Sequence, residues 1–319
     1  MSARLITKYR QFGGLRLVRE YWRLGVLPII VKQLWRIVRT GESSKTIYPA
    51  VCERVDPFLL EKYGTQMQQL IDEHRGQERV HLHSNKVWFC WLQGMEQAPD
   101  LVKACHRSIV SNLTDRDVTV ITSLNYSDYV TLPRFVEDKY RRGIIPPAMF
   151  ADLIRLELLT RFGGTWMDAT VLCTGRRYPR KVMDGNLFLM QYRDSQGQLI
   201  GYSNWFITSV TNHPILTVLR ELLYQYWKDY DCVLEYYIFH LFFGEISRSF
   251  PEEIAAMPRN NNYLTLQLGH RISDLYDDKW MEQLLASCCF HKLNYRLTKE
   301  VTCDTHNFYS EILKRYLTD

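Results

Sequence analysis

The first forty residues combine apolar and basic positions at a helical period. Apolar residues recur in two stripes, made of Leu15, Val18, Trp22 and Gly25 and then of Val31, Leu34, Trp35 and Val38. Cations lie beside each stripe, namely Arg16, Arg19, Arg23, Lys32, Arg36 and Arg39. This pattern predicts two amphipathic helices. Pro28 lies between the stripes and is expected to break or kink the helix there.

The next segment changes character twice before the main body of the chain. Residues 40–49 contain Gly41, Ser43 and Ser44 and indicate a linker, and the apolar spacing of 56–74 predicts a helix. From Lys86 onward, short apolar runs alternate with periodic segments. Strands are predicted at 87–92, 117–123, 165–173 and 186–192, and helices at 100–111 and 147–162. This alternation is typical of an α/β sheet with helices on its faces. We therefore expect a basic helical segment at 1–42, a linker and helix at 43–84, and an α/β domain at 85–319.

Composition and charge exclude several classes of protein. Hydrophobic residues make up 46% of the 319 residues and charged residues 24%, which is ordinary for a globular protein. Residues 1–40 carry nine cations and one acid, or +8, so that the net charge of +5 leaves −3 for the rest of the chain. A nucleic-acid groove across the fold is therefore not expected. The cysteines form no Cys-x-x-Cys pair, which argues against a common zinc site and favours free thiols in a reducing compartment.

The basic N-terminal segment is a candidate for a membrane surface. Its longest apolar stretch, residues 24–31, has eight residues and contains Pro28, whereas a bilayer span needs about 20. Neither a transmembrane helix nor a signal peptide is expected. Basic helices with Trp on the apolar face can lie in a membrane interface, and the alternative is a helix pair packed on the body with a solvated basic face. We expect a peripheral protein on the cytoplasmic, inner face of the cell membrane, bound to anionic lipid.

Residues with candidate chemistry gather between 148 and 171. Asp152 and Arg155 are three apart on the predicted helix and so lie on one face, either as a solvated ion pair or as part of a site. Gly163-Gly164 fits a helix end with positive φ and a tight turn into a strand. On that strand Trp166, Asp168 and Thr170 share a face. A carboxylate there can face a ligand crevice, or neighbouring backbone N–H groups can satisfy it.

Five blocks of the sequence carry a resemblance to a known family. Asp-Leu-Ile-Arg at 152–155 followed by Phe-Gly-Gly-Thr-Trp-Met-Asp-Ala-Thr-Val at 162–171 resembles the centre of sugar transferases with an Asp-x-Asp sequence after a Gly-Gly turn. The blocks at 87–109, 203–207, 235–240 and 290–295 agree in order. Together they resemble the capsular polysaccharide synthesis proteins, related to glycosyltransferase family 32 and more distantly to the clostridial glucosylating toxins.

The resemblance implies a GT-A type nucleotide-sugar transferase fold, a Rossmann-like mixed sheet flanked by helices. It implies that Trp91 stacks on the donor base, although a core Trp is the alternative. It implies that Asp152 and Arg155 contact donor hydroxyls, with Gly164 beside them in the donor site. Asp168 would hold Mn²⁺ or Mg²⁺ against the diphosphate.

The chain departs from the family pattern at one position. Family 32 usually has a second carboxylate two residues after the first, and here Thr170 stands in that position. The Asp-Ala-Thr form is what the resemblance to the capsular branch implies, so the metal is still expected. A hydroxyl is a poorer ligand for a hard cation than a carboxylate, so Thr170 would hold a metal-bound water or a sugar hydroxyl. Late in the chain, Lys292 would offset charge on the leaving diphosphate, and His291 would ligate the metal or bond a phosphate oxygen. Both can equally be surface residues, and His240 is expected to be a buried, hydrogen-bonded histidine.

These expectations define a bacterial hexosyltransferase. It would move a hexose from a nucleoside diphosphate sugar, a UDP-sugar in the first instance, to a hydroxyl of a capsular or other surface polysaccharide on a lipid carrier, with help from a metal. A non-catalytic nucleotide-sugar-binding or assembly subunit is the alternative, and a sugar-nucleotide hydrolase is a third possibility. The sequence does not indicate the sugar, the acceptor or the linkage.

Overall fold

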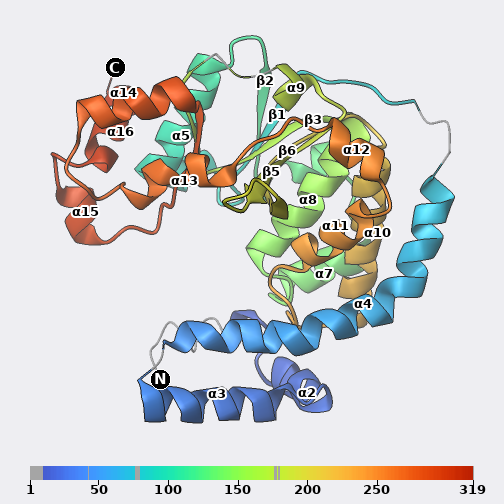
Figure 1. Ribbon diagram of the computed structural model, residues 1–319. Coiled ribbons are helices and arrows are strands. Elements are labelled where there is room, and N and C mark those ends of the chain that lie inside the picture. The colour runs from blue at the N-terminus through green and yellow to red at the C-terminus, as the bar shows by residue number, and fades with distance from the viewer. Residues whose placement is uncertain (1–9, 42, 76–79, 176–177, 179, 319) are drawn as a thin grey trace. The chain divides into compact units, whose positions relative to one another are not determined.

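The fold is described from a computed structural model, which covers residues 10–41, 43–75, 80–175, 178 and 180–318. The chain forms two compact units, and each unit is built from segments that are far apart in sequence (Figure 1). The first unit lies within Met1–Glu78, Thr131–Leu156 and Pro214–Ser249. The second lies within Arg79–Val130, Glu157–His213 and Phe250–Asp319. The first two segments expected from the sequence, 1–42 and 43–84, thus contribute mainly to the first unit.

The first unit is helical. Its helices are α2 (Leu15–Arg23), α3 (Val26–Thr40), η1 (Ser44–Thr46), α4 (Ile47–His74), α7 (Arg134–Arg141), most of α8 (Pro147–Phe162), α10 (Pro214–Asp229) and α11 (Ile238–Ser247). The long helix α4 buries every fourth residue, namely Val51, Val55, Leu59, Tyr63, Met67 and Ile71. This stripe packs against α10 and α11, and α3 lies alongside α4 (Figure 1).

Two boundaries in this unit differ from the prediction. The break between the basic helices falls at Leu24–Gly25, because Gly25 adopts a left-handed conformation with φ of 68°. Pro28 lies in the first turn of α3. Backbone N–H groups in the first turn have no intrahelical acceptor, so the missing N–H of proline costs no hydrogen bond there. The expected linker at 40–49 is short, since α4 already begins at Ile47. None of the helices in the described part of the chain is long and apolar enough to cross a bilayer.

The second unit contains a mixed sheet. Its strands are β1 (Lys86–Cys90), β2 (Asp117–Ile121), β3 (Gly164–Asp168), β5 (Leu187–Arg193) and β6 (Leu199–Ser209), in the order β2-β1-β3-β6-β5. Strands β2, β1 and β3 are parallel, and β6 and β5 continue the sheet antiparallel. A second, two-stranded sheet pairs β4 (Val171–Cys173) with β7 (Phe290–Lys292).

Helices and two apolar clusters enclose these strands. The helices are η2 (Met95–Gln97), α5 (Asp100–Asn112), α6 (Tyr126–Tyr129), α9 (Arg180–Asp184), α12 (Pro251–Ala256), α13 (Asn262–His270), α14 (Asp278–Ser287), α15 (Lys299–Cys303) and α16 (Phe308–Leu317). One cluster centres on Phe89, Met167 and Phe206 of the large sheet. The other joins α5, α13, α14 and α16 around Leu172 of β4. The expected α/β architecture, a mixed sheet flanked by helices, is confirmed.

Candidate functional site

The turn that leads into the site depends on two glycines. Gly163 ends α8 with φ of 65°, and Gly164 begins β3 with φ of 92°. A Cβ on Gly164 would lie 2.5 Å from the Lys86 carbonyl oxygen of β1. Both positions therefore need glycine, as the sequence predicted. Gly164 lies at the opposite end of β3 from Asp168, so the geometry gives it a structural role rather than contact with a donor.

The strand expected at 165–173 is two strands, and that prediction was wrong. β3 ends at Asp168, the chain turns at Ala169 and Thr170, and β4 then joins the other sheet. Continuous apolar character does not reveal such a change of partner, because both strands are buried. The consequence is that Asp168 lies at the carboxyl end of a strand, where open α/β sheets bind ligands.

Asp168, Thr170 and Lys292 converge at this strand end. The β4–β7 register pairs Val171 with Lys292. The Lys292 ammonium donates to Asp168 Oδ2 and to Thr170 Oγ1, each at 2.8 Å. Trp166, on the same face of β3, donates its indole N–H to Asp168 Oδ1 at 2.9 Å. The Asp168 and Lys292 side chains are 27% and 23% exposed, so this ion pair is partly buried but open to solvent.

His291, next to Lys292, does not face the same way. Its side chain is fully buried, and Nε2 lies 3.0 Å from the Thr174 hydroxyl. Burial lowers the pKa of His291 to about 4, so the imidazole is neutral at physiological pH. The expectation that His291 is a surface residue is wrong. The geometry also gives no support to its expected role as a metal ligand or phosphate contact, because neighbouring residues of a strand point to opposite faces.

A divalent cation fits these residues poorly. Asp168 is the one carboxylate of the group, and the Lys292 ammonium already lies against it. Two unit charges 4 Å apart near a protein surface interact by about 4 kcal/mol, and a divalent ion beside an ammonium would roughly double that repulsion. Mn²⁺ and Mg²⁺ are held by carboxylates and other oxygen ligands, and a single carboxylate bonded to a lysine is a weak set. The structure thus has the Lys292 ammonium beside Asp168, where the resemblance implied a metal.

Trp88 and Trp91, at the first strand, differ in whether they belong to the core or are placed to contact a ligand. Trp88 is fully buried and donates its N–H to the Gly163 carbonyl at 2.9 Å, so it is the core tryptophan. Trp91 follows β1 and is half-buried, with its ring edge-on to Tyr295 at 5.2 Å between centroids. Its indole N–H is buried and has no hydrogen-bond partner in the described part of the chain. Trp91 therefore has an N–H available to a ligand.

Asp152 and Arg155 form an ion pair within the first unit. Arg155 Nη1 lies 3.1 Å from Asp152 Oδ1, and the two side chains are only 5% and 18% exposed. The Arg155 guanidinium also lies 5.9 Å from the Phe239 ring of α11. The alternative of a solvated ion pair is therefore wrong. Buried pairs are expensive to form and strongly destabilising to break, so the question becomes why the chain keeps this one.

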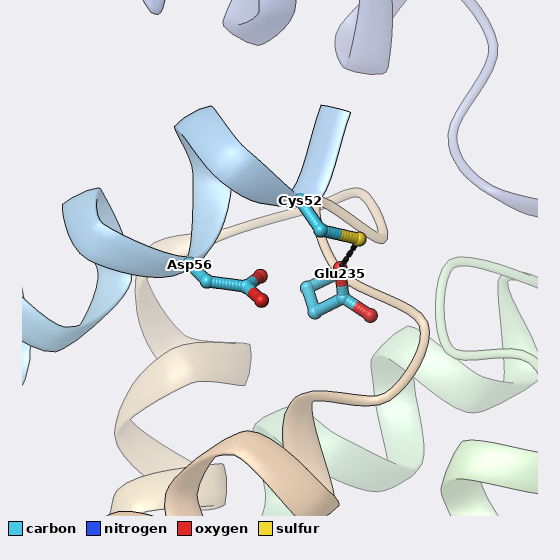
Figure 2. Close-up of side chains that lie close together, drawn as sticks. All are labelled: Cys52, Asp56 and Glu235. Carbon is cyan, nitrogen blue, oxygen red and sulfur yellow. Dashed lines mark hydrogen bonds between the residues drawn. The ribbon is translucent and has the colours of Figure 1, made fainter. Parts of the chain in front are cut away.

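A second polar cluster in the first unit was not foreseen. Glu235 is buried and accepts hydrogen bonds from the Tyr48 hydroxyl, from Cys52 Sγ at 3.2 Å and from the Tyr237 N–H at 2.6 Å. Figure 2 shows Asp56, from the next turn of α4, directed at the same carboxylate. Burial, followed by the charge of Glu235 and a hydrogen bond to it, raises the pKa of Asp56 to about 7. The neighbouring Glu235 carboxylate thus favours the protonated form of Asp56.

Cys52, Asp56 and Glu235 could each offer one atom to a metal. Cys52 is already bonded to Glu235, as is Tyr48, so the cluster is better explained as a link between α4 and the segment before α11. The sequence holds a partial signal, because Cys52 and Asp56 are four apart on one helical face. Glu235 is distant in sequence, and no local pattern pairs it with them. His240, expected to be buried, is half-buried between the rings of Tyr237 and Phe239.

The raised pKa of Asp56 predicts a pH-dependent stability. The contribution of Asp56 is fully present below pH 3.8, the ordinary pKa of the group, and is lost as pH rises from there to about 7. Asp56→Asn should therefore leave the melting temperature unchanged at about pH 3.5 and raise stability at about pH 8.5, by about 1 kcal/mol because the group is half-exposed. Thermal unfolding at both pH values measures this. Glu53→Gln, an exposed carboxylate on the same helix, is the control, and an equal shift at both pH values would contradict the prediction.

The fold and this site define an α/β protein with an acidic side chain and a lysine at the carboxyl end of its parallel strands. The chain belongs to the family described as capsular polysaccharide synthesis protein, whose model matches residues 37–312. No curated protein matches the chain. Among solved structures, it is similar to the PaToxG glycosyltransferase, with 13% identity, 83% of this chain and 96% of that chain covered and a TM-score of 0.36. It is also similar to the catalytic domain of alpha-toxin from Clostridium novyi, with 11% identity, 92% and 90% covered and a TM-score of 0.31.

Proposed function

We propose that this protein is a glycosyltransferase that transfers a hexose from a nucleoside diphosphate sugar, a UDP-sugar in the first instance, to a hydroxyl of a capsular or other surface polysaccharide intermediate. The observation that carries the proposal is the partly exposed Asp168–Lys292 pair at the carboxyl end of β3, in a member of a capsule synthesis family. A cation at this position suits a diphosphate leaving group. Trp91, with its available N–H, suits the donor base.

The proposed reaction needs few groups. Lys292 would bind the diphosphate and stabilise the charge that develops as the bond to the sugar breaks. Asp168 and Thr170 would hold the ammonium in position, since both bond to it. For Asp152 and Arg155, contact with donor hydroxyls stays a prediction from the resemblance.

A donor panel tests the proposal. Purified protein is incubated with UDP- and GDP-sugars and with lipid extract from cells that make a capsule, and radiolabelled sugar is followed into the lipid fraction. Transfer of one sugar supports the proposal. Slow release of free sugar alone would indicate a hydrolase, and nucleotide binding without turnover would indicate a non-catalytic subunit. The non-catalytic subunit is included as an outcome because Asp168 is the one carboxylate that pairs with Lys292 in the described part of the chain.

The helices α2 and α3 support a further part of the proposal, attachment to an anionic membrane. Large apolar side chains on them are exposed, namely Leu15 at 82%, Trp22 at 73%, Val31 at 64%, Leu34 at 48%, Trp35 at 61% and Val38 at 85%. On α3 these residues lie at i, i+3, i+4 and i+7 and form one face, flanked by Lys32, Arg36 and Arg39. Val26 packs inward. The helix pair thus both packs on the protein and leaves an apolar, basic face outside.

That face fits the surface of an anionic bilayer. Trp and aliphatic side chains enter the interface, and each cation near an anionic leaflet contributes about 1 kcal/mol. Such docking would hold the protein beside a lipid-linked acceptor at the inner face of the membrane, while the donor arrives from the cytoplasm.

Vesicle flotation with the full chain checks this attachment. The protein should float with vesicles containing phosphatidylserine, and less in high salt because screening weakens exposed charges. The double variant Trp22→Ala/Trp35→Ala should reduce the bound fraction at least about five-fold. Leu124→Ala/Leu275→Ala, which removes two exposed apolar side chains of the second unit, is the control and should float normally. Equal flotation of both double variants would refute the proposal. A dimer in solution that dissociates only in the Trp22→Ala/Trp35→Ala variant would also refute it, because the apolar face would then bind a second copy of the chain.

A further inference from the structure

We propose that the Lys292 ammonium takes the place of a divalent cation at the donor diphosphate, so that this protein needs no metal. The inference rests on the transferase function proposed above. It concerns how the site neutralises the charge of its substrate.

The position of Lys292 is determined by backbone pairing. β7 pairs with β4 so that Lys292 lies opposite Val171, directly after Thr170. Leu293 N–H donates to the Thr170 carbonyl at 2.9 Å and continues this pairing past the strand end. A slip of one residue would exchange Lys292 with His291 and direct the ammonium to the other face. The lysine is therefore held at the strand end by the sheet itself and not only by its own flexible side chain.

The ammonium is held from two sides and remains able to bind a ligand. Two of its three protons are directed at Asp168 Oδ2 and Thr170 Oγ1, both at 2.8 Å. The third is available for a phosphate oxygen. The side chain is 23% exposed, so a ligand can reach it without unfolding the site.

The replacement is consistent in charge. Two carboxylates and one divalent cation sum to zero, and so do one carboxylate and one ammonium. Two replacements thus compensate for each other in charge: Thr170 stands in place of a second carboxylate, and Lys292 stands in place of a metal. A second carboxylate beside Asp168 would leave the lysine site with excess negative charge and would weaken diphosphate binding.

His291 cannot restore a metal site. It is fully buried on the other face of β7, bonded to Thr174. The group of His, Cys, Asp and Glu side chains that the described residues offer to a metal is the one around Glu235, and it does not include Asp168.

The proposed step balances without a metal. The bond between the sugar C1 and the diphosphate oxygen breaks, and its electron pair stays on that oxygen, to which Lys292 donates a hydrogen bond. The acceptor oxygen forms the new bond to C1, and its proton ends on the released diphosphate. Lys292 keeps its proton and acts as a fixed charge.

The first experiment uses the metal alone and needs no donor. Mn²⁺ is titrated into the full chain and free Mn²⁺ is followed by electron paramagnetic resonance. We expect the unaltered protein and Asp168→Asn to bind Mn²⁺ equally at concentrations up to about 1 mM, so that no binding depends on Asp168. The double variant Thr170→Asp/Lys292→Met, which restores two carboxylates and removes the ammonium, should gain one Mn²⁺. Saturable binding to the unaltered protein that Asp168→Asn abolishes would overturn the proposal.

The second experiment measures binding of UDP and GDP by calorimetry, with EDTA or with Mn²⁺. Binding should be equal in the two conditions and should weaken at least about ten-fold in Lys292→Met, whereas Lys292→Arg should retain most of it. Lys299→Met, which removes an exposed lysine at the start of α15, should bind normally. Binding that requires Mn²⁺ would overturn only the role of Lys292. Absence of binding to either nucleotide in both conditions would overturn the proposed function as well.

Discussion

Asp168→Asn should lower donor turnover at least about 100-fold while the protein stays folded, the range measured for loss of a single preorganised electrostatic group in other enzymes. Asparagine keeps the shape of the side chain and can still accept from the Trp166 indole. It removes the charge that holds the Lys292 ammonium at 2.8 Å. Lys292 would then lose its fixed position, and the site would lose its balance of charge. Initial rates with the active donor, together with a thermal melt, measure both effects.

The same sheet supplies a matched control. Lys86 and Asp117 form another Lys–Asp pair, between the first residues of β1 and β2. That pair lies at the amino ends of the parallel strands, away from Asp168, and Asp117 is more than half exposed. Asp117→Asn should leave turnover unchanged and alter stability by about 0.5 kcal/mol or less. Equal losses in the two variants would mean that Asp168 contributes only to folding.

Local signals in the sequence were sufficient for much of the second unit. The helix predicted at 147–162 is α8, with the same bounds, because its apolar period is strong and Gly163-Gly164 ends it. The Gly163-Gly164 turn and the start of the following strand were predicted for the same reason, whereas the end of β3 at Asp168 was not. These features are determined by residues close together in sequence, and the local hydrophobic period predicts such features well.

Pairings between distant segments were not predictable from the sequence. The partner of β4 is β7, more than a hundred residues later, and only that register brings Lys292 to Asp168. The sequence singled out Lys292 as a charge for the diphosphate, but nothing in it indicated that the lysine would pair with Asp168. His291 was misjudged for the same reason, since its burial follows from the face of β7 on which it lies.

Glu235 shows the same limit in the helical unit. Its block was recognised as similar to the family, yet its partners Cys52 and Asp56 lie on a helix about 180 residues earlier. The start of α4 was also placed too late, because Gly41, Ser43 and Ser44 indicated a linker up to residue 49, whereas α4 begins at Ile47. Pro49 lies in the first turn, where it is tolerated, and packing of the buried face compensates for Pro57.

Arg155→Ala should destabilise the protein by about 3–5 kcal/mol, the cost measured elsewhere for removing one member of a buried ion pair. The Arg155 side chain is 5% exposed and paired with Asp152, so its loss removes the opposite charge from a carboxylate that is only 18% exposed. Asp138 and Arg141 on α7 are the control, since they have the same residue types and the same spacing but lie exposed. Arg141→Ala should cost about 0.5 kcal/mol or less. Urea unfolding of both variants measures the difference.

A double variant then separates structure from function at this pair. Asp152→Leu/Arg155→Met removes both charges together and fills the space with apolar groups of similar size, and such replacements are often neutral or stabilising by about 1–4 kcal/mol. We expect this variant to recover most of the stability lost in Arg155→Ala and to remain at least about 100-fold impaired in turnover, because the hydrogen-bonding groups expected to contact the donor are gone. Stability recovered together with full turnover would mean that the pair serves folding alone. A stable but inactive protein would show that the chain keeps a costly buried ion pair for its substrate.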